Sequence, residues 1–474
     1  MKSRKLLFVV MSLGLIVRLL YLWLGTKIYP ARPDIFTDSD TWLWFNSFKN
    51  LYELGVYSSD LSLEYGIVSR TPGYSFFIGI FYVLFGGDKS LIFPAIGYAQ
   101  LFLDVLAVWF VFKIVSQLFQ SKKTALIAAF IYAFYPFVMV HNPVAYSESL
   151  SIFLLLLSFY AYCYAPQRLK WFTVGSILGI ATLVRPQISL FIPLFGLILL
   201  YENRKSFSSI VKLGTLLTLG VLLTYGMWPL RNYINHKKIV LTQDLRGFSN
   251  WGEDVINFMT LMHSVKENWQ PQFGQILRNE KVETPELLKR NLENETLFQE
   301  TIKKAQHCSF GFSQWQTMGY WKKPLTEQGC TQEVANGFAL LRQKVIEQYP
   351  FEYYVRIPLL NLRKALFKIN LHDASKSNAF ISLLFLYRSF LIFIGLAGSF
   401  LWLKSTETQY KPIVLLILVY FIGWYVLLCA GTGVQMRNIE MRYFLPADVI
   451  LLFPAVYLIK QLLWGKNDWQ QEGI

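Results

Sequence analysis

Long uninterrupted apolar stretches constrain this chain more than any other feature of its sequence. A helix needs about 20 apolar residues to cross the hydrocarbon core of a bilayer. Of the 474 residues, 54% are hydrophobic and only 16% are charged, whereas an average soluble domain carries about 25% charged residues. Runs long enough to cross a bilayer recur along the chain, and they predict an all-α polytopic membrane protein.

Apolar length and charge together predict about ten transmembrane helices. Lys and Arg favour the cytoplasmic side of short loops, and Lys2, Arg4 and Lys5 precede the first run, so we expect the N-terminus inside. Counting onward places the C-terminus inside as well, in a cytoplasmic (inner) membrane. The expected spans are 6–25, 91–117, 124–140, 149–165, 171–184, 188–201, 207–228, 379–403, 412–430 and 443–462.

The apolar run 73–86 is the exception, because it is too short to span comfortably. If it did span, the pairs Lys122/Lys123 and Arg204/Lys205 would fall on the outer side, against the charge rule. We therefore expect an interfacial helix within an outer loop, 26–90.

The polar segment 231–377 contains no spanning run, which predicts an external, mostly helical domain or lid. It separates an N-terminal transmembrane catalytic module, 1–230, from C-terminal transmembrane helices, 378–474. Cys308 and Cys330 lie in this segment, and they could form a disulfide if the segment is exported. Cys163 and Cys429 fall in apolar runs and are expected to be inert.

The formal net charge of +15 would suggest nucleic acid as a partner of a soluble protein. Here the positive-inside rule explains the excess, because much of it lies in short loops that can be cytoplasmic. We expect membrane lipids and no nucleic acid as partners.

With this topology, unusual polar residues gather at the outer ends of the helices. Ionisable groups at membrane depth are costly and are candidates for function. Acids that meet arginines at one face suggest a site for an anionic substrate, with a base and a possible metal. The residues are Asp38, Asp40, Arg70, His141, Glu148, Arg185, Arg231, Asn232, Glu440 and Arg442.

The acids in "FTDSDTWLWF" could have any of three roles. Asp38 and Asp40 could converge on Mg²⁺ or Mn²⁺, which prefer hard oxygen ligands. Either could be a general base for an acceptor hydroxyl or amine. Alternatively, they could simply cap the helix that starts near Trp42.

The other residues could likewise have either functional or purely structural roles. Arg70 in "SRTPGYS" and Arg185 in "LVRPQ" could bind a phosphate, or Arg70 could snorkel to lipid headgroups. Glu148 in "HNPVAYSESL" could orient a base or merely favour a helix start. His141 reads as structural, and Glu440 and Arg442 could pair with each other.

Six motifs occur in a fixed order: the acid pair, "RTPGY", an outer "SE", "LVRP", "WPLRN" and "EMRYFLP". In this the chain resembles the GT-C membrane glycosyltransferases, in particular the bacterial branch related to protein O-mannosyltransferases and lipid A aminoarabinose transferases. The resemblance covers about 1–255 and 380–460, and 256–377 has no counterpart in it. Many relatives read "RPPGYP" where this chain reads "RTPGYS", so the turn here is less rigid.

The resemblance implies a GT-C-like fold and transfer of a sugar from a polyprenyl-phosphate-linked donor on the outer side of the membrane. The acceptor, whether lipid, glycan or protein, stays open, as do the sugar and the oligomeric state. Asp38 or Asp40 would activate the acceptor, with Glu148 as a further acid and a divalent cation (Mg or Mn) as a possible cofactor at Asp38 and Asp40. Basic groups near the lipid phosphate would be Arg70, Arg185, Arg231 and Arg442, and further candidates are Tyr74, His141, Asn232 and Glu440.

A transporter or flippase of a lipid-linked glycan is the main alternative, and a membrane scaffold is another. Transporters often contain paired repeats with broken helices at the bilayer midplane. The sequence shows no such repeat, and its ionisable residues cluster at one face instead, which favours an enzyme.

Overall fold

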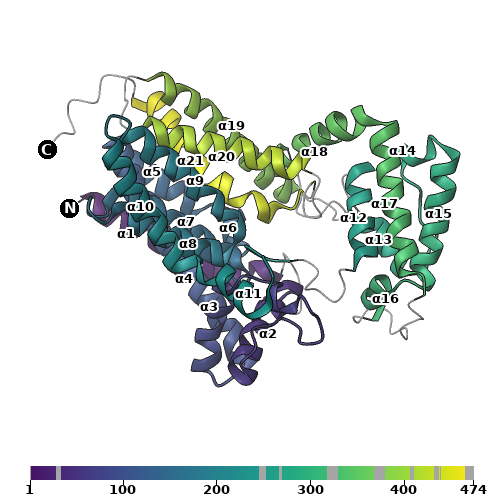
Figure 1. The fold of residues 1–474 in the computed structure, drawn as a ribbon. Helices are drawn as coiled ribbons and strands as arrows, with labels where there is room; N and C mark the ends of the chain where they lie inside the picture. The colour runs from purple at the N-terminus through teal and green to yellow at the C-terminus, as the bar shows by residue number, and fades with distance from the viewer. Residues whose placement is uncertain are drawn as a thin grey trace.

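The computed structural model describes residues 2–27, 34–244, 252–265, 269–317, 329–367, 379–405, 410–431, 437 and 439–464. The parts of the predicted segments 26–90, 231–377 and 378–474 that fall between these ranges lie outside the described residues. Within the described ranges every regular element is helical. The helices form a large bundle and a smaller group beside it (Figure 1).

Seven helices of the bundle are long and apolar enough to cross a membrane, by length and composition. This confirms the predicted all-α polytopic class. The helices are α1 (Lys2–Trp23), α4 (Lys89–Phe119), α7 (Ser147–Tyr164), α10 (Phe207–Tyr225), α19 (Ala379–Lys404), α20 (Lys411–Ala430) and α21 (Met441–Trp464).

Three further predicted spans correspond to shorter helices, so the count of ten stays a prediction. These are α5 (Lys122–Ala133), α8 (Lys170–Val184) and α9 (Phe191–Glu202). The run 124–140 is interrupted because the residue before a proline disfavours helical backbone, and Pro136 starts the short helix α6 (Pro136–Met139). The run 207–228 also divides, since α10 ends at Tyr225 and α11 (Met227–His236) begins after Gly226.

The first loop contributes α2 (Ser39–Leu54) and α3 (Pro72–Leu84), which pack together beside α4 and α8 (Figure 1). Pro72 occupies the first turn of α3, where its fixed φ favours a helix start. Gly73 permits close packing, because a Cβ there would lie 2.6 Å from the backbone N of Val184. The turn "RTPG" therefore brings Arg70 close to the end of α8, where Arg185 lies.

The smaller group of helices has a hydrophobic core of its own, which includes the buried rings of Phe258, Phe312 and Phe338. Figure 1 shows this group standing apart from the bundle, with the N-terminus and the C-terminus at the far side of the bundle. Its helices are α12 (Glu253–Val265), α13 (Gln270–Leu277), α14 (Glu286–Lys289), α15 (Leu292–His307), α16 (Phe310–Thr317) and α17 (Thr331–Gln348). We call it the polar domain.

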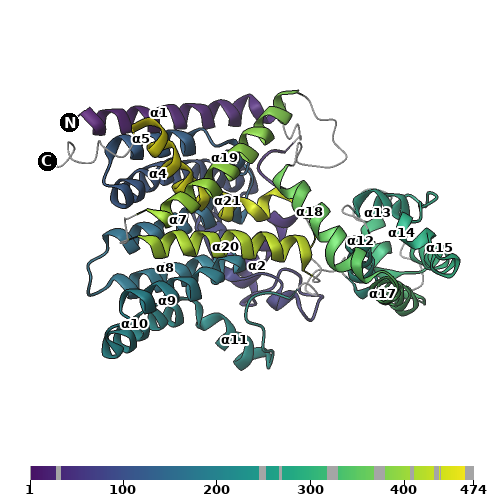
Figure 2. The same cartoon turned by 90° about the horizontal axis from the view of Figure 1, so that it is seen from above.

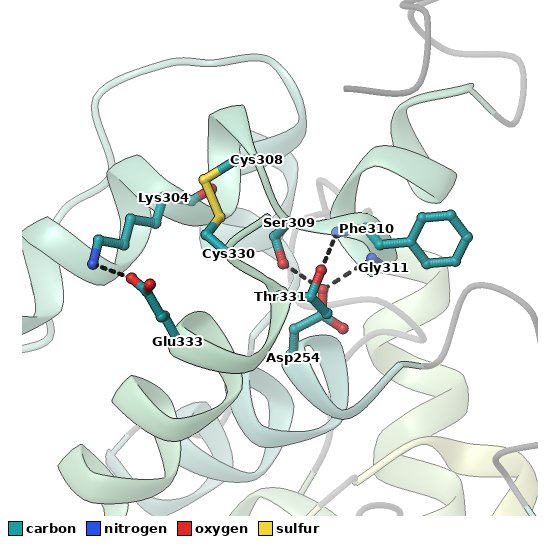
Figure 3. Close-up of a disulfide and its surroundings, with 9 residues drawn as sticks. All are labelled: Asp254, Lys304, Cys308, Ser309, Phe310, Gly311, Cys330, Thr331 and Glu333. Atoms are coloured by element: carbon teal, nitrogen blue, oxygen red, sulfur yellow. Dashed lines mark hydrogen bonds and ion pairs between the residues drawn. A yellow bond between two sulfur atoms is a disulfide. The ribbon is translucent and has the colours of Figure 1, made fainter. Parts of the chain in front are cut away.

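A disulfide between Cys308 and Cys330 connects the end of α15 to the start of α17 (Figure 3), as the sequence allowed. Beside it, Asp254 accepts hydrogen bonds from the Ser309 hydroxyl and the Gly311 N–H. Asp254 therefore fixes the start of α16 through two hydrogen bonds within the polar domain.

On the C-terminal side of the polar domain, a π-helical turn, Glu352–Arg356, and then α18 (Ile357–Leu366) lead toward the bundle. Figure 2 shows α18 between the two parts. Arg388 of α19 donates to the Ala365 carbonyl at 2.6 Å and pairs with Asp448 of α21 at 2.7 Å. Asn361 donates to the Cys429 carbonyl of α20 at 3.1 Å. These buried contacts anchor α18 to the last three long helices.

Candidate active site

The site begins at the start of α2, where the two acids have different environments. Asp38 immediately precedes the helix, and its backbone N–H donates to the Thr41 hydroxyl at 3.0 Å. A side chain three residues into a helix that reaches back in this way completes half of a capping box. Thr41 therefore satisfies the helix start, and the Asp38 carboxylate instead accepts a hydrogen bond from the Tyr146 hydroxyl.

Asp40, in the first turn of α2, bridges two arginines from distant parts of the chain. Arg70 Nη2 lies 2.8 Å from one carboxylate oxygen of Asp40, and Arg442 Nη1 lies 2.8 Å from the other. Burial raises the pKa of Asp40, but the positive charges of Arg70, Arg442 and Arg185 outweigh it and lower the pKa to about 2. Asp40 is therefore ionised at neutral pH and is too weak a base to accept a proton readily.

Glu148 and Arg185 form a second, more deeply buried ion pair. Glu148 lies in the first turn of α7, and its Oε1 is 2.6 Å from Arg185 Nη1. Arg185 ends α8 in an extended conformation because Pro186 follows it. The same nitrogen donates to the Ser147 hydroxyl at 3.3 Å. Glu148 Oε2 is buried and accepts no hydrogen bond from the described residues.

Aromatic rings support the arginines from several elements. The Arg70 guanidinium lies 4.8 Å from the centre of the Trp44 ring, and Arg442 lies 5.3 Å from that of Tyr146. Arg185 lies 5.6 Å from the Tyr443 ring. Such cation–π contacts hold guanidinium groups without using their hydrogen-bond donors. Arg442 also contacts its neighbour Glu440, with Nε 3.2 Å from a carboxylate oxygen, so the pairing that the sequence left open is present together with the Asp40 contact.

His141 is partly buried near this cluster. Burial lowers its pKa to about 4, the charge of Glu148 opposes that shift, and Arg442 and Arg185 add to it. The imidazole is therefore neutral at physiological pH. Tyr74 is fully buried, and its hydroxyl donates to Gln100 Oε1 at 2.7 Å. Tyr74 thus supports the site from beneath and does not border it.

Arg231 and Asn232 are held in different contacts from the other candidates. Arg231 donates to the backbone carbonyls of Ile67 at 2.8 Å and Tyr57 at 3.1 Å. Asn232 donates to the Val240 carbonyl at 3.0 Å. Both side chains fasten α11 to neighbouring loops, and no contact in the described part of the chain joins them to Asp40 or Glu148.

The predicted cation site fits these residues poorly. Both oxygens of Asp40 already accept from arginines, and a further cation would face the positive charges of Arg70, Arg442 and Arg185. Among the described residues, no three His, Cys, Asp or Glu side chains come together as metal ligands.

Trp44, Tyr146 and Tyr443 were not among the site residues predicted from the sequence. Tyr146 lies two residues before Glu148 in a motif that was already singled out, and Trp44 and Tyr443 neighbour the acid pair and Arg442. Aromatic residues beside outer arginines were the available signal. Their abundance at membrane interfaces in general hides it.

A family model matches the part of the chain that carries much of this site. Residues 69–228 match the model described as dolichyl-phosphate-mannose-protein mannosyltransferase. The matched region contains Arg70, Tyr74, His141, Glu148 and Arg185. Asp38, Asp40 and Arg442 lie outside it. No curated protein matches the sequence.

Three solved structures of an oligosaccharyltransferase from Archaeoglobus fulgidus are similar, each with a TM-score of 0.50. The apo form is 13% identical and aligns with 98% of this chain and 52% of that one. The complex with Zn and sulfate is 14% identical, with 96% and 49% aligned. The form tethered to an acceptor peptide containing the NVT sequon is 13% identical, with 98% and 52% aligned.

The chain thus spans about half the length of these solved proteins, and at this identity the likeness concerns the fold. Taken with the matched family model, the fold is that of the GT-C membrane glycosyltransferases. The matched family model and the shared fold are thus those of membrane glycosyltransferases, and seven of the described helices are long and apolar enough to cross a membrane.

Proposed function

We propose that this protein transfers a sugar from a polyprenyl-phosphate-linked donor to an acceptor on the outer side of the cytoplasmic membrane, with Asp38 as the general base. The observation that carries this proposal is the arginine bridge: Arg70 and Arg442 close on Asp40, while the neighbouring Asp38 carboxylate accepts a hydrogen bond from the Tyr146 hydroxyl. In this arrangement Asp40 holds the two arginines in place, and Asp38 is the acid that can accept a proton.

The reaction is a direct displacement at the anomeric carbon of the donor. Asp38 takes the proton of the acceptor hydroxyl or amine, and the acceptor atom bonds to the anomeric carbon. The bond between that carbon and the phosphate oxygen breaks, and polyprenyl phosphate leaves with the electron pair. Phosphate needs no acid to leave, so one base is sufficient, whereas a glycoside hydrolase uses two carboxylates.

Arg70, Arg185 and Arg442 supply the positive charge for the donor. Guanidinium groups bind phosphate through paired N–H donors, and a fixed cationic cluster stabilises the charge that develops on the leaving phosphate. Tyr146 donates to Asp38 and thereby fixes the orientation of the base. Glu148 holds Arg185 in place through their 2.6 Å contact.

The orientation in the membrane is part of the proposal. Disulfides persist in oxidising compartments, so the Cys308–Cys330 disulfide supports an outer location for the polar domain. Figure 2 shows both termini on the side of the bundle away from this domain, and α2 nearer to the domain than the termini are. The site and the polar domain then face outward together, and the termini face the cytoplasm.

The direct test uses the purified protein in nanodiscs with a panel of polyprenyl-phosphate sugars. Loss of donor and formation of free polyprenyl phosphate in the presence of envelope extract, measured by mass spectrometry, is the expected result. The glycosylated product in the extract identifies the acceptor. Turnover of no donor in the panel, with every donor remaining intact, would contradict the proposed function. Movement of intact donor between leaflets would indicate a flippase instead.

A further inference from the structure

A polar stripe on α4 is not explained by the proposed chemistry. Gly97, Gln100 and Asp104 are spaced i, i+3 and i+7, so they share one face of a helix. The helix is otherwise strongly apolar and long enough to span the membrane. Gln100 is 0% exposed and Asp104 is 2% exposed. Buried polar groups within a membrane are costly unless they are fully hydrogen-bonded, which raises the question of what they hold.

Each member of the stripe contacts the segment that leads to Glu148. Gln100 Nε2 donates to the carbonyls of Asn142 at 2.9 Å and Val144 at 2.7 Å. Asn142 Nδ2 donates to Asp104 Oδ2 at 2.8 Å. At Gly97, a Cβ would lie 2.9 Å from the Pro143 carbonyl oxygen, so only glycine allows this approach without displacement.

The same segment is joined directly to the stretch of chain that carries Asp38. The Ala145 N–H donates to the Phe36 carbonyl at 2.8 Å. The Thr41 hydroxyl donates to the Ala145 carbonyl at 3.1 Å. The Phe36 ring also rests over Gly97, where a Cβ would approach it to 3.0 Å. The two acid-bearing segments, 36–41 and 142–148, are therefore docked against each other and on one helix face.

Three further contacts fix the orientation of the stripe itself. The Tyr74 hydroxyl donates to Gln100 Oε1 at 2.7 Å, which leaves the amide N–H₂ group facing the 142–144 carbonyls. Arg18 Nε lies 2.7 Å from Asp104 Oδ2, and the Tyr132 hydroxyl donates to Oδ1 at 2.7 Å. The Gln100 amide and both Asp104 oxygens are thereby hydrogen-bonded, and buried groups satisfied in this way favour one rigid arrangement.

We propose that Gln100, Asp104 and Asn142 are positioning residues that set the spacing between the Asp38 base and the Glu148–Arg185 pair. None of the three belongs to the arginine bridge. They act through the backbone of residues 142–145. The polar stripe contacts this backbone on one side, and the segment 36–41 contacts it on the other. A base displaced by about 1 Å loses much of the advantage of proximity, so the stripe determines turnover and not donor affinity. This inference rests on the proposed function.

The test compares Gln100→Met with a matched control on the same helix, Gln117→Met. Methionine has a similar volume to glutamine but donates no hydrogen bond. Gln117 lies 17 positions further along α4, and its side chain donates a 3.2 Å hydrogen bond to the Tyr410 hydroxyl. We expect Gln100→Met to lower kcat by roughly tenfold to a hundredfold with the KM for donor changed less than about threefold. Gln117→Met should keep both constants within about twofold.

Hydrogen exchange provides a readout that does not depend on activity. Gln100→Met should speed amide exchange in peptides covering 36–41 and 142–148, while Gln117→Met should leave those peptides unchanged. Unchanged exchange there in Gln100→Met would overturn the inference, as would a kcat within about twofold of wild type. If wild-type protein turns over no donor, the proposed function fails, and the exchange experiment still decides whether the stripe positions the two segments.

Gln100→Glu keeps the test possible if the methionine variant does not fold. The carboxylate that this substitution introduces would, when ionised, face two carbonyl oxygens, whereas its protonated form can donate to one of them. Turnover relative to wild type should therefore rise as the pH falls. A ratio to wild type that does not vary with pH would contradict the positioning role.

Discussion

Arg442 Nη1 lies 2.8 Å from a carboxylate oxygen of Asp40, although the two residues are 402 positions apart in the chain. The contact joins the first turn of α2 to the first turn of α21. Arg70 occupies the other oxygen of Asp40, so the first loop, the turn before α3 and the last long helix meet at one carboxylate. Asp40 is thus the point at which the N-terminal module and the C-terminal helices are joined at the candidate site.

Replacing Asp40 with asparagine should destabilise the protein as well as reduce turnover. The substitution removes the negative charge between two arginines that are themselves mostly buried, and hydrogen bonds to charged groups contribute about 1–3 kcal/mol each. Thermal unfolding of the purified variant should therefore begin at a lower temperature. Glu286→Gln is a suitable control, because Glu286 pairs with Lys289 at the surface with 87% of its side chain exposed. Equal melting temperatures for Asp40→Asn and the control would be inconsistent with a bridging role.

The contribution of Asp40 to stability should depend on pH in a defined direction. Its pKa is lowered from 3.8 to about 2, so the folded state favours the ionised form. The stabilisation is therefore complete above about pH 4 and is lost as the pH falls toward about 2. The difference in melting temperature between wild type and Asp40→Asn should be equal at about pH 7 and 5 and smaller at about pH 3. A difference that already disappears at about pH 5 would place the pKa of Asp40 much higher.

Removal of divalent cations should leave sugar transfer largely intact. Guanidinium groups occupy the Asp40 oxygens, and in the proposed reaction arginines supply the positive charge at the donor phosphate. We expect chelator-treated protein to keep its rate within about twofold of untreated protein. A rate lost on chelation and restored by one specific cation would require a ligand set that includes Asp38.

The Cys308–Cys330 disulfide should stabilise the polar domain. It closes a loop with a sequence separation of 22 residues, for which chain-entropy estimates give about 3 kcal/mol. Cys308→Ser should make this domain more sensitive to protease at moderate temperature, with little effect on the bundle. Cys163→Ser, at a free cysteine, controls for thiol removal. Protease resistance equal to wild type in Cys308→Ser would show that the domain does not depend on the bond.

The sequence predicted the long helices well because apolar length is a property of a single segment. The seven longest apolar helices were all expected, and so was the helix at 72–84. Proline and glycine divided other runs: Pro136 interrupts 124–140, and Gly226 separates α10 from α11. Where several weak breakers lie in an apolar run, tertiary packing decides which of them ends a helix.

The pairing of charges was much less predictable. Arg18 and Asp104 each lie inside an expected span, and their buried 2.7 Å contact joins residues 86 positions apart. The sequence did signal them, since isolated charges in apolar runs are unusual, but it did not identify the partner of each. Arg231 differs, because the motif "WPLRN" did single it out. Its guanidinium nevertheless donates to the carbonyls of Ile67 and Tyr57.

The sequence alone also could not distinguish the roles of Asp38 and Asp40, and their contacts in the structure were needed. Both acids have aromatic neighbours at the same spacing, so the sequence alone treats them alike. They differ because Asp40 lies between Arg70 and Arg442, whereas the Asp38 carboxylate accepts from Tyr146 and the Asp38 N–H is satisfied by Thr41. The roles that we propose for the two acids therefore follow from packing between segments far apart in the chain.

The most direct test of the proposed chemistry is the turnover of Asp38→Asn in nanodiscs with a polyprenyl-phosphate sugar that wild type uses. The variant should fold and melt like wild type and bind donor with an affinity within about threefold, because the arginine bridge is intact. Its turnover should fall by at least about a hundredfold, since the amide cannot accept the acceptor proton. A folded Asp38→Asn protein that transfers sugar at the wild-type rate would contradict the assignment of Asp38 as the base.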